Sequence, residues 1–392
     1  TALIILKEMG ETAVPLLSIL LNDRDDDVRK FAIDLIHDIQ YCDYPEKLVV
    51  MLIEDTNVNV RAAAAKTLGA LQYTESIQLL IEALKDEEWV AFSALEALTL
   101  FNDDSSIDPI IRLIDHFSDT IRFAAIEALG KIGNPKATPR LLEFLAKAEG
   151  FEKMVTVKSL VQIGDIEKAP EVKGILYDML KESEWDDKII AIQGLVALNE
   201  SASIPQMMDI AGELDMSHPD HEDYIYMIRD AIIGFGCNKH LLNILKNESM
   251  RYKGKVMAIE IAGTIRCAEA VPYLINLLNS EYRDVKRSCI KSLGEIKNDE
   301  AQTYLMMAIK DEDSHVRKSA VSALGSISDM SAFEPLMNML HQEIYNDVID
   351  AFICALIHIN EELFISRISE FSENIKNLVS DRVNGFNPEI SC

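Results

Sequence analysis

The 392-residue chain lacks the cysteine spacings that build disulfide frameworks or zinc sites. No two of its six cysteines are close enough for a CxxC motif, and most lie within apolar helical patterns, as small buried hydrophobic residues do. These cysteines are Cys42, Cys237, Cys267, Cys289, Cys354 and Cys392. We therefore expect neither a disulfide framework nor a zinc site, and a reducing compartment in which the thiols stay free.

Long apolar runs and basic charge are also scarce. No run of about 18 apolar residues exists for a membrane span, and the apolar residues 1–6 form too short a stretch, without a basic region, for a signal peptide. The chain has 38 basic and 65 acidic residues, a formal net charge of −27, which repels phosphate backbones and anionic lipids. This composition predicts a cytoplasmic protein that binds neither nucleic acid nor membranes and favours protein partners with basic segments.

Motifs for catalysis and cofactor binding are absent from the sequence as well. It contains no Gly-rich phosphate loop and no Ser-His-Asp order that stands out. His218 and His221 have carboxylates nearby, but Pro219 interrupts the helical frame that would fix metal ligands, and no third His or Cys is close. The acidic turns at residues 23–27 and 311–313 lack the central glycine of an EF-hand loop. We expect no metal, no cofactor and no enzymatic activity.

What the sequence does contain is a repeat of roughly 30 residues, visible for example at residues 12–40 and 270–297. Each unit has two amphipathic helical patterns joined by a short polar turn. The first pattern often carries a proline near its start, such as Pro15 or Pro272, where a helix loses no intrahelical donor. The second often stops at a glycine, such as Gly133 or Gly164, which adopts a left-handed C-cap at little cost.

These units resemble HEAT repeats, and specifically the short bacterial subclass that is also seen in phycobilisome-lyase-like proteins. The resemblance is carried by the pairs Val28-Arg29, Val60-Arg61 and Val316-Arg317 and by the endings Ala128-Leu129-Gly130 and Ala323-Leu324-Gly325. It implies an all-α, right-handed α–α superhelix of about eleven helical hairpins whose second helices line the concave side. We expect a single solenoid over residues 1–384, with a partial first repeat at 1–11, about eleven repeats at 12–360, a capping helix at 361–384 and a tail at 385–392.

One position of the second helices is almost always basic. This structural ladder consists of Arg29, Arg61, Arg122, Lys188, Lys286 and Arg317, and Lys153 and Lys255 occupy the same position. The cations could bind anions, or each could pair with an acidic residue of its own or the next turn, such as Asp23, Asp55 or Asp311. The resemblance to HEAT proteins, in which an Asp–Arg ladder is structural, favours the second interpretation.

The next position carries a stripe of mostly apolar residues on the face that points away from the core. The stripe consists of Phe92, Phe123, Met154, Ile189, Tyr226 and Val256, with Trp89 beside it as an aromatic anchor. An exposed apolar stripe is typical of a binding site, and a helix or extended peptide could lie along it. Alternatively, a tight superhelical curvature buries the same side chains against neighbouring second helices.

Taken together, these patterns predict a non-catalytic scaffold or adaptor that binds a protein or peptide on its concave face. The alternative, implied by the resemblance to phycobilisome lyases, is a bilin-lyase-like enzyme or chaperone that acts on an acceptor protein. An exposed stripe with no catalytic motif favours the scaffold.

Overall fold

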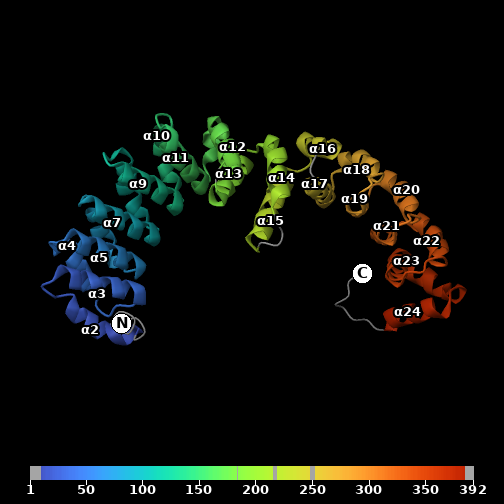
Figure 1. Cartoon of the computed structure of the whole chain (residues 1–392), viewed down its shortest axis with the longest axis horizontal. Coiled ribbons are helices and arrows are strands. Elements are labelled where there is room, and N and C mark those ends of the chain that lie inside the picture. The colour runs from blue at the N-terminus through green and yellow to red at the C-terminus, as the bar shows by residue number, and fades with distance from the viewer. Residues whose placement is uncertain (1–9, 183, 215–218, 248–251, 385–392) are drawn as a thin grey trace. The chain divides into compact units, whose positions relative to one another are not determined.

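Helices make up all the regular secondary structure of residues 10–182, 184–214, 219–247 and 252–384, the part of the chain that the computed structural model describes (Figure 1). The all-α prediction is therefore confirmed for these residues. Short 3-10 helices, such as Thr74–Ser76 and Asp104–Ser106, lead into several of the first helices. Residues 1–9, most of the expected partial first repeat, and the expected tail at 385–392 lie outside the described residues.

The chain divides into two compact units, unit 1 (Thr1–Leu198) and unit 2 (Asn199–Cys392). Unit 1 contains α2 (Val14–Leu20), α3 (Asp26–Ile39), α4 (Pro45–Glu54), α5 (Val58–Ala70), α6 (Ile77–Ala83), α7 (Glu88–Phe101), α8 (Ile107–Arg112), α9 (Asp119–Ile132), α10 (Thr138–Leu145), α11 (Gly150–Ile163), α12 (Lys173–Glu182) and α13 (Trp185–Ala197). Unit 2 contains α14 (Ile204–Glu213), α15 (Pro219–Gly234), α16 (Lys239–Lys246), α17 (Tyr252–Thr264), α18 (Val271–Leu277), α19 (Arg283–Ile296), α20 (Asp299–Ala308), α21 (Ser314–Ile327), α22 (Phe333–Leu340), α23 (Asn346–Ser366) and α24 (Glu373–Asn384). The expectation of one solenoid over residues 1–384 stays a prediction.

Within each unit the helices form consecutive hairpins, from α2–α3 and α4–α5 in unit 1 to α22–α23 in unit 2. Second helices pack on second helices: α5 lies against α7 and α7 against α9, and in unit 2 α17 lies against α19 and α19 against α21. They form the inner layer of each unit, and the first helices form the outer layer (Figure 1). The core lies between the layers, because apolar residues four apart share one helical face; Val60, Ala64 and Leu68 of α5 are fully buried.

Short polar side chains determine where the second helices begin. The Asp25 carboxylate accepts a hydrogen bond from the amide of Asp27 at the start of α3, and Asp313 accepts one from the amide of His315 at the start of α21. Such caps satisfy amide donors that the first helical turn leaves without partners. The acidic turns of the sequence are thus explained locally as helix caps.

Neighbouring second helices approach each other to backbone contact near their C-terminal ends. A Cβ atom added to Gly69 of α5 would lie 2.6 Å from the Cα atom of Ala97 in α7, and one added to Gly294 of α19 would lie 3.0 Å from the Cα atom of Ala323 in α21. At the matching contact between α9 and α11, the buried Ser159 hydroxyl donates a 2.8 Å hydrogen bond to the carbonyl oxygen of Ile126. Small residues at these positions are what allow the inner helices to stack so closely.

The C-terminal end differs from the single capping helix that was expected over residues 361–384. Asn360 has a non-helical backbone (φ −162°, ψ 94°), and its side-chain oxygen accepts a 3.0 Å hydrogen bond from the amide of Leu363. Because asparagine caps a new helical segment in this way, the chain bends there, and α24 begins separately at Glu373. The expected cap is therefore two helical segments rather than one.

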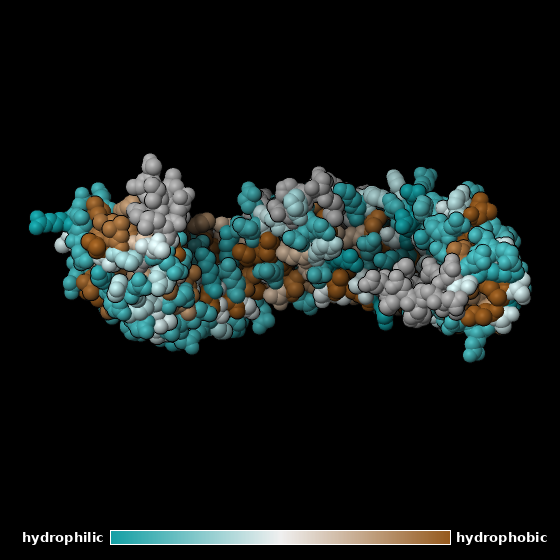
Figure 2. Space-filling model, turned by 90° about the horizontal axis from the view of Figure 1, so that it is seen from below, coloured by the Kyte–Doolittle hydropathy of each residue, from teal (hydrophilic) through white to brown (hydrophobic). Residues whose placement is uncertain are grey.

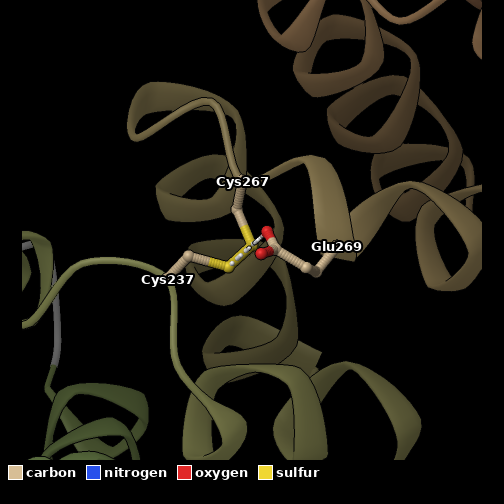
Figure 3. Close-up of side chains that lie close together, drawn as sticks. All are labelled: Cys237, Cys267 and Glu269. Carbon is tan, nitrogen blue, oxygen red and sulfur yellow. Dashed lines mark hydrogen bonds between the residues drawn. A yellow bond between two sulfur atoms is a disulfide. The ribbon is translucent and has the colours of Figure 1, made fainter.

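The cysteine prediction was wrong at one place. Cys237 and Cys267 form a disulfide with their Cα atoms 5.4 Å apart, and an oxygen of Glu269 lies 3.3 Å from the Cys237 sulfur (Figure 3). The two cysteines are 30 residues apart, about one repeat, so stacking of consecutive repeats brings equivalent positions together although the sequence keeps them apart. Of the other cysteines that the structure describes, Cys42, Cys289 and Cys354 form no disulfide, and Cys392 lies outside the described residues.

Candidate binding surface

The cations of the ladder pair with acidic residues in the turn of the following repeat. The pairs are Arg29–Asp55, Arg61–Asp86 and Arg122–Glu152 in unit 1, and Lys286–Asp311 and Arg317–Glu343 in unit 2. The Arg29 guanidinium donates to both Asp55 oxygens, at 2.7 and 2.9 Å, and also to the carbonyl oxygen of Asp23 in its own turn at 2.9 Å. Each such arginine links two consecutive turns, so its charge is already used inside the protein.

Burial and hydrogen bonding shift the pKa of these carboxylates in opposite directions. Partial burial alone would raise the pKa of Asp55, but hydrogen bonds from Arg29 and from the Asn57 amide outweigh it, so the pKa of Asp55 is lowered. The same balance lowers the pKa of Glu343 beside Arg317. These pairs are therefore ionised at neutral pH, and their side chains are at most 14% exposed.

Lys188 of the ladder lies beside an aromatic ring. Its ammonium nitrogen lies 5.7 Å from the centre of the Trp185 ring, on the same helix α13, which places a cation over an aromatic face. Asp187, the residue before Lys188, pairs with Lys158 of α11 at 2.5 Å.

The apolar stripe lies on the second helices of both units. Phe92 belongs to α7, Phe123 to α9, Met154 to α11 and Ile189 to α13 in unit 1, whereas Tyr226 belongs to α15 and Val256 to α17 in unit 2. All are half-buried except Tyr226, which is 51% exposed, and the neighbouring Trp89 is 66% exposed. Packing against neighbouring helices does not remove any of these seven side chains from the surface.

In unit 1 the stripe includes two aromatic pairs near the N-terminal ends of α7, α9 and α11, which together are called the aromatic cluster below. The rings of Trp89 and Phe92 meet edge-on with centres 6.3 Å apart, and those of Phe123 and Phe151 meet edge-on at 5.1 Å. Phe151 is 55% exposed and was not among the predicted residues. It lies in the first turn of α11, where Gly150-Phe151 stands in place of the usual acidic residues, and this departure from the repeat pattern was the signal for it.

Phe92 also forms one wall of a pocket of about 300 Å³ between α7 and α9. Leu100 and Ala124 add apolar surface, and the side chains of Lys66 and His37 lie at its edge. The Nδ1 atom of His37 is buried and has no hydrogen-bond partner among the described residues. Glu96, Glu127 and Lys131 also line it, and a mixture of apolar surface and a few polar groups is typical of a ligand pocket. The face of the chain shown in Figure 2 has further apolar patches among hydrophilic side chains.

Within the part of the chain that the structure describes, two other groups of side chains have the composition of metal sites. Asp25, Asp26 and Asp27 bring carboxylate oxygens within 4.8 Å of one another, but they are the capping turn of α3. Cys237, Cys267 and Glu269 meet the same distance criterion, but the two sulfurs bond to each other (Figure 3). His221 lies in α15, and His218 lies outside the described residues.

No helix among the described residues combines the length and apolar character needed to cross a bilayer.

Among curated proteins, none matches the chain by sequence. Among solved structures, Kap121p bound to Ste12p and Kap121p bound to Nup53p each match with a TM-score of 0.59 at 15% identity, over 96% and 97% of this chain. Kap95p with RanGDP matches with a TM-score of 0.51 at 13% identity, over 97% of this chain and 60% of that one.

This chain spans about half the length of the Kap121p structures, 47% and 48% of each, and at such identities the likeness shows the fold alone: an all-α superhelical solenoid. The family described as HEAT repeats matches residues 13–99, 85–161, 238–309 and 274–357. That family is broader than the phycobilisome-lyase-like subclass, which stays a prediction. Because the overlapping matches cover residues 13–161 and 238–357, well over half of the sequence, the chain belongs to the HEAT-repeat family.

Proposed function

We propose that this HEAT-repeat protein is a non-catalytic scaffold whose second helices bind a segment of a partner protein. The observation that carries the proposal is the aromatic cluster of unit 1, in which Trp89, Phe92, Phe123 and Phe151 lie partly exposed on three adjacent helices. Exposed aromatic side chains that are held rigidly in pairs are typical anchors of protein interfaces. The solved Kap121p structures, named as bound to Ste12p and to Nup53p, support a protein-binding use of the fold.

The segment that fits this surface is a helix or an extended peptide with an apolar side chain for the pocket beside Phe92. That pocket, at about 300 Å³, is large enough for one bulky aliphatic or aromatic side chain of the partner. The net charge of −27 favours a partner segment that is basic outside this anchor. Met154 and Ile189 continue the apolar surface along unit 1, and Tyr226 and Val256 extend the proposal to unit 2.

The test compares the wild-type chain with a Phe92→Asp/Phe123→Asp variant. Proteins that the wild type retains from lysate are identified by mass spectrometry, and the best candidate is purified and titrated against both chains by calorimetry. Losing two aromatic anchors at about 1.5 kcal/mol each should weaken binding by about 100-fold.

A Val50→Asp/Ile53→Asp variant is the matched control, because both side chains are more than half exposed on the outer helix α4. The control should bind like the wild type, and circular dichroism should show that all three chains have the same helix content. Equal affinity for the wild type and the Phe92→Asp/Phe123→Asp variant would show that the partner binds elsewhere.

A further inference from the structure

The inner face of unit 2 contains a pocket of about 710 Å³ that extends over α17, α19 and α21. Among the described residues that line it are five cationic side chains and a single carboxylate, that of Glu295. The cations are Arg266, Arg287, Lys291, Lys297 and Lys318. On a chain with a net charge of −27, this lining has the opposite balance of charge from the sequence as a whole.

The repeat explains why these cations gather. Arg287 of α19 and Lys318 of α21 are 31 residues apart, as are Arg266 and Lys297, so each pair occupies equivalent positions of consecutive repeats. Arg266 and Lys297 both have a positive φ, of 50° and 55°, at the C-terminal ends of α17 and α19. Stacking of the second helices therefore places two rows of cations side by side, one at mid-helix and one at the helix ends.

Short side chains on α21 leave the space that these cations surround. Ser319, Ser322 and Ser326 line the pocket on this helix. The hydroxyls of Ser319 and Ser326 donate to carbonyl oxygens of their own helix, at 2.9 and 3.0 Å. Those hydroxyl protons are thus already in use, and the groups that would bind an anion are the lysines and arginines.

These cations are weakly paired inside the protein, in contrast to those of the ladder. The pairs within the described residues are Arg287–Asp284 at 3.6 Å, Lys291–Glu295 at 3.9 Å and Lys318–Asp347 at 3.5 Å. Arg266 and Lys297 form no ion pair with any residue that the structure describes. Long, exposed ion pairs contribute about 1 kcal/mol or less, so an incoming carboxylate can replace them at little cost.

We propose that this pocket binds an extended acidic segment of a partner protein. Packed helices lie 8–10 Å apart, so the cations from α17 to α21 extend over roughly 20 Å. An extended chain advances about 3.3 Å per residue, which makes a segment of about six residues the right length. Glu260 and Asp284 line the adjoining pocket beside Arg287. Their carboxylates repel an acidic segment, so the segment should not extend into that pocket. The inference shares with the proposed function the idea of a protein-binding scaffold, but its cations are separate from the aromatic cluster of unit 1 on which that proposal rests.

The test is a fluorescence-anisotropy titration of the full chain with fluorescein-labelled hexaglutamate at about 50 mM salt. The wild type should bind it, with an affinity that falls steeply as salt is added, because exposed charges are screened. A Lys291→Glu/Lys318→Glu variant should bind at least tenfold more weakly. Lys239→Glu/Lys246→Glu, on the outer helix α16, makes the same change in net charge and should leave the affinity within twofold of the wild type.

Three results would overturn the proposal: no binding of hexaglutamate to a wild type with full helix content, equal weakening by both double variants, or tighter binding of labelled oligo-dT than of hexaglutamate. The last would assign the pocket to nucleic acid. The Phe92→Asp/Phe123→Asp variant should bind hexaglutamate like the wild type, because those residues lie in unit 1. Loss of hexaglutamate binding and loss of the unit 1 partner therefore report on separate proposals.

Discussion

Replacing Gly69 by alanine adds a methyl group where α5 touches α7, and two opposing effects decide the outcome. Alanine favours a helix over glycine by at most about 1 kcal/mol, and less here because Gly69 is one residue from the end of α5. The added Cβ would lie 2.6 Å from both the Cα and the Cβ atoms of Ala97, about 1 Å closer than an ordinary contact. Overpacking typically costs about 1–3 kcal/mol, and a backbone neighbour favours the upper end of that range.

We therefore expect Gly69→Ala to lower the free energy of unfolding by about 2 kcal/mol. The measurement is urea unfolding followed by circular dichroism, beside a Gly174→Ala control in α12, where an added Cβ meets nothing within 4 Å. The control should be neutral or stabilised by up to about 1 kcal/mol. If Gly69→Ala raises the urea midpoint of unfolding as Gly174→Ala does, α5 and α7 do not pack as closely as described.

Two further predictions concern pH and redox state. Because the folded pKa of Glu343 is lowered beside Arg317, the pair stabilises the fold above the ordinary carboxyl pKa and loses this effect as the pH falls through the lowered value. As the pH falls from 6 to 3, the melting temperature should thus decrease less steeply for Glu343→Gln than for the wild type. If the melting temperatures of the two chains decrease in parallel with pH, the pKa of Glu343 is not lowered. Reducing the Cys237–Cys267 bond, which closes a loop of 30 residues, should lower the free energy of unfolding by about 3.6 kcal/mol in the chain-entropy model. Urea unfolding with and without dithiothreitol tests this, with Cys237→Ser/Cys267→Ser as the variant that should not respond; a wild type indifferent to reductant would rule out the bond.

The fold could be predicted because its signals are local and recur. A Val-Arg pair behind a short acidic turn contains both the cap and the first buried residue of a second helix, so Val28-Arg29 and Val60-Arg61 indicate the architecture before any contact is known. The bend at Asn360, near the C-terminal end, could not be predicted in the same way. Asn360 lies within an apolar helical pattern, and its role as a cap depends on its backbone angles rather than on the pattern.

The candidate surfaces were less accessible to sequence reasoning. The turn acids expected for the ladder included Asp55, and the structure shows Arg29 bound to it from the preceding repeat. The basic pocket of unit 2 was not anticipated, since Arg266 and Lys297 look like ordinary helix ends until stacking brings them together. The disulfide was missed for the same reason: proximity between repeats depends on equivalent positions, whereas the cysteines were judged by their distance along the chain.

The sequence separation of residues that touch between consecutive repeats also affects how the chain folds. Arg29 and Asp55 are 26 residues apart, Ser159 and Ile126 are 33 apart, and the two bonded cysteines are 30 apart. Each of these contacts joins residues that are only about one repeat apart in the sequence, so the mean sequence separation of contacting residues, the contact order, is low. A low contact order favours rapid folding despite the length of the sequence. Each hairpin can thus dock on its predecessor as soon as it leaves the ribosome, so synthesis from the N-terminus would lengthen the solenoid repeat by repeat.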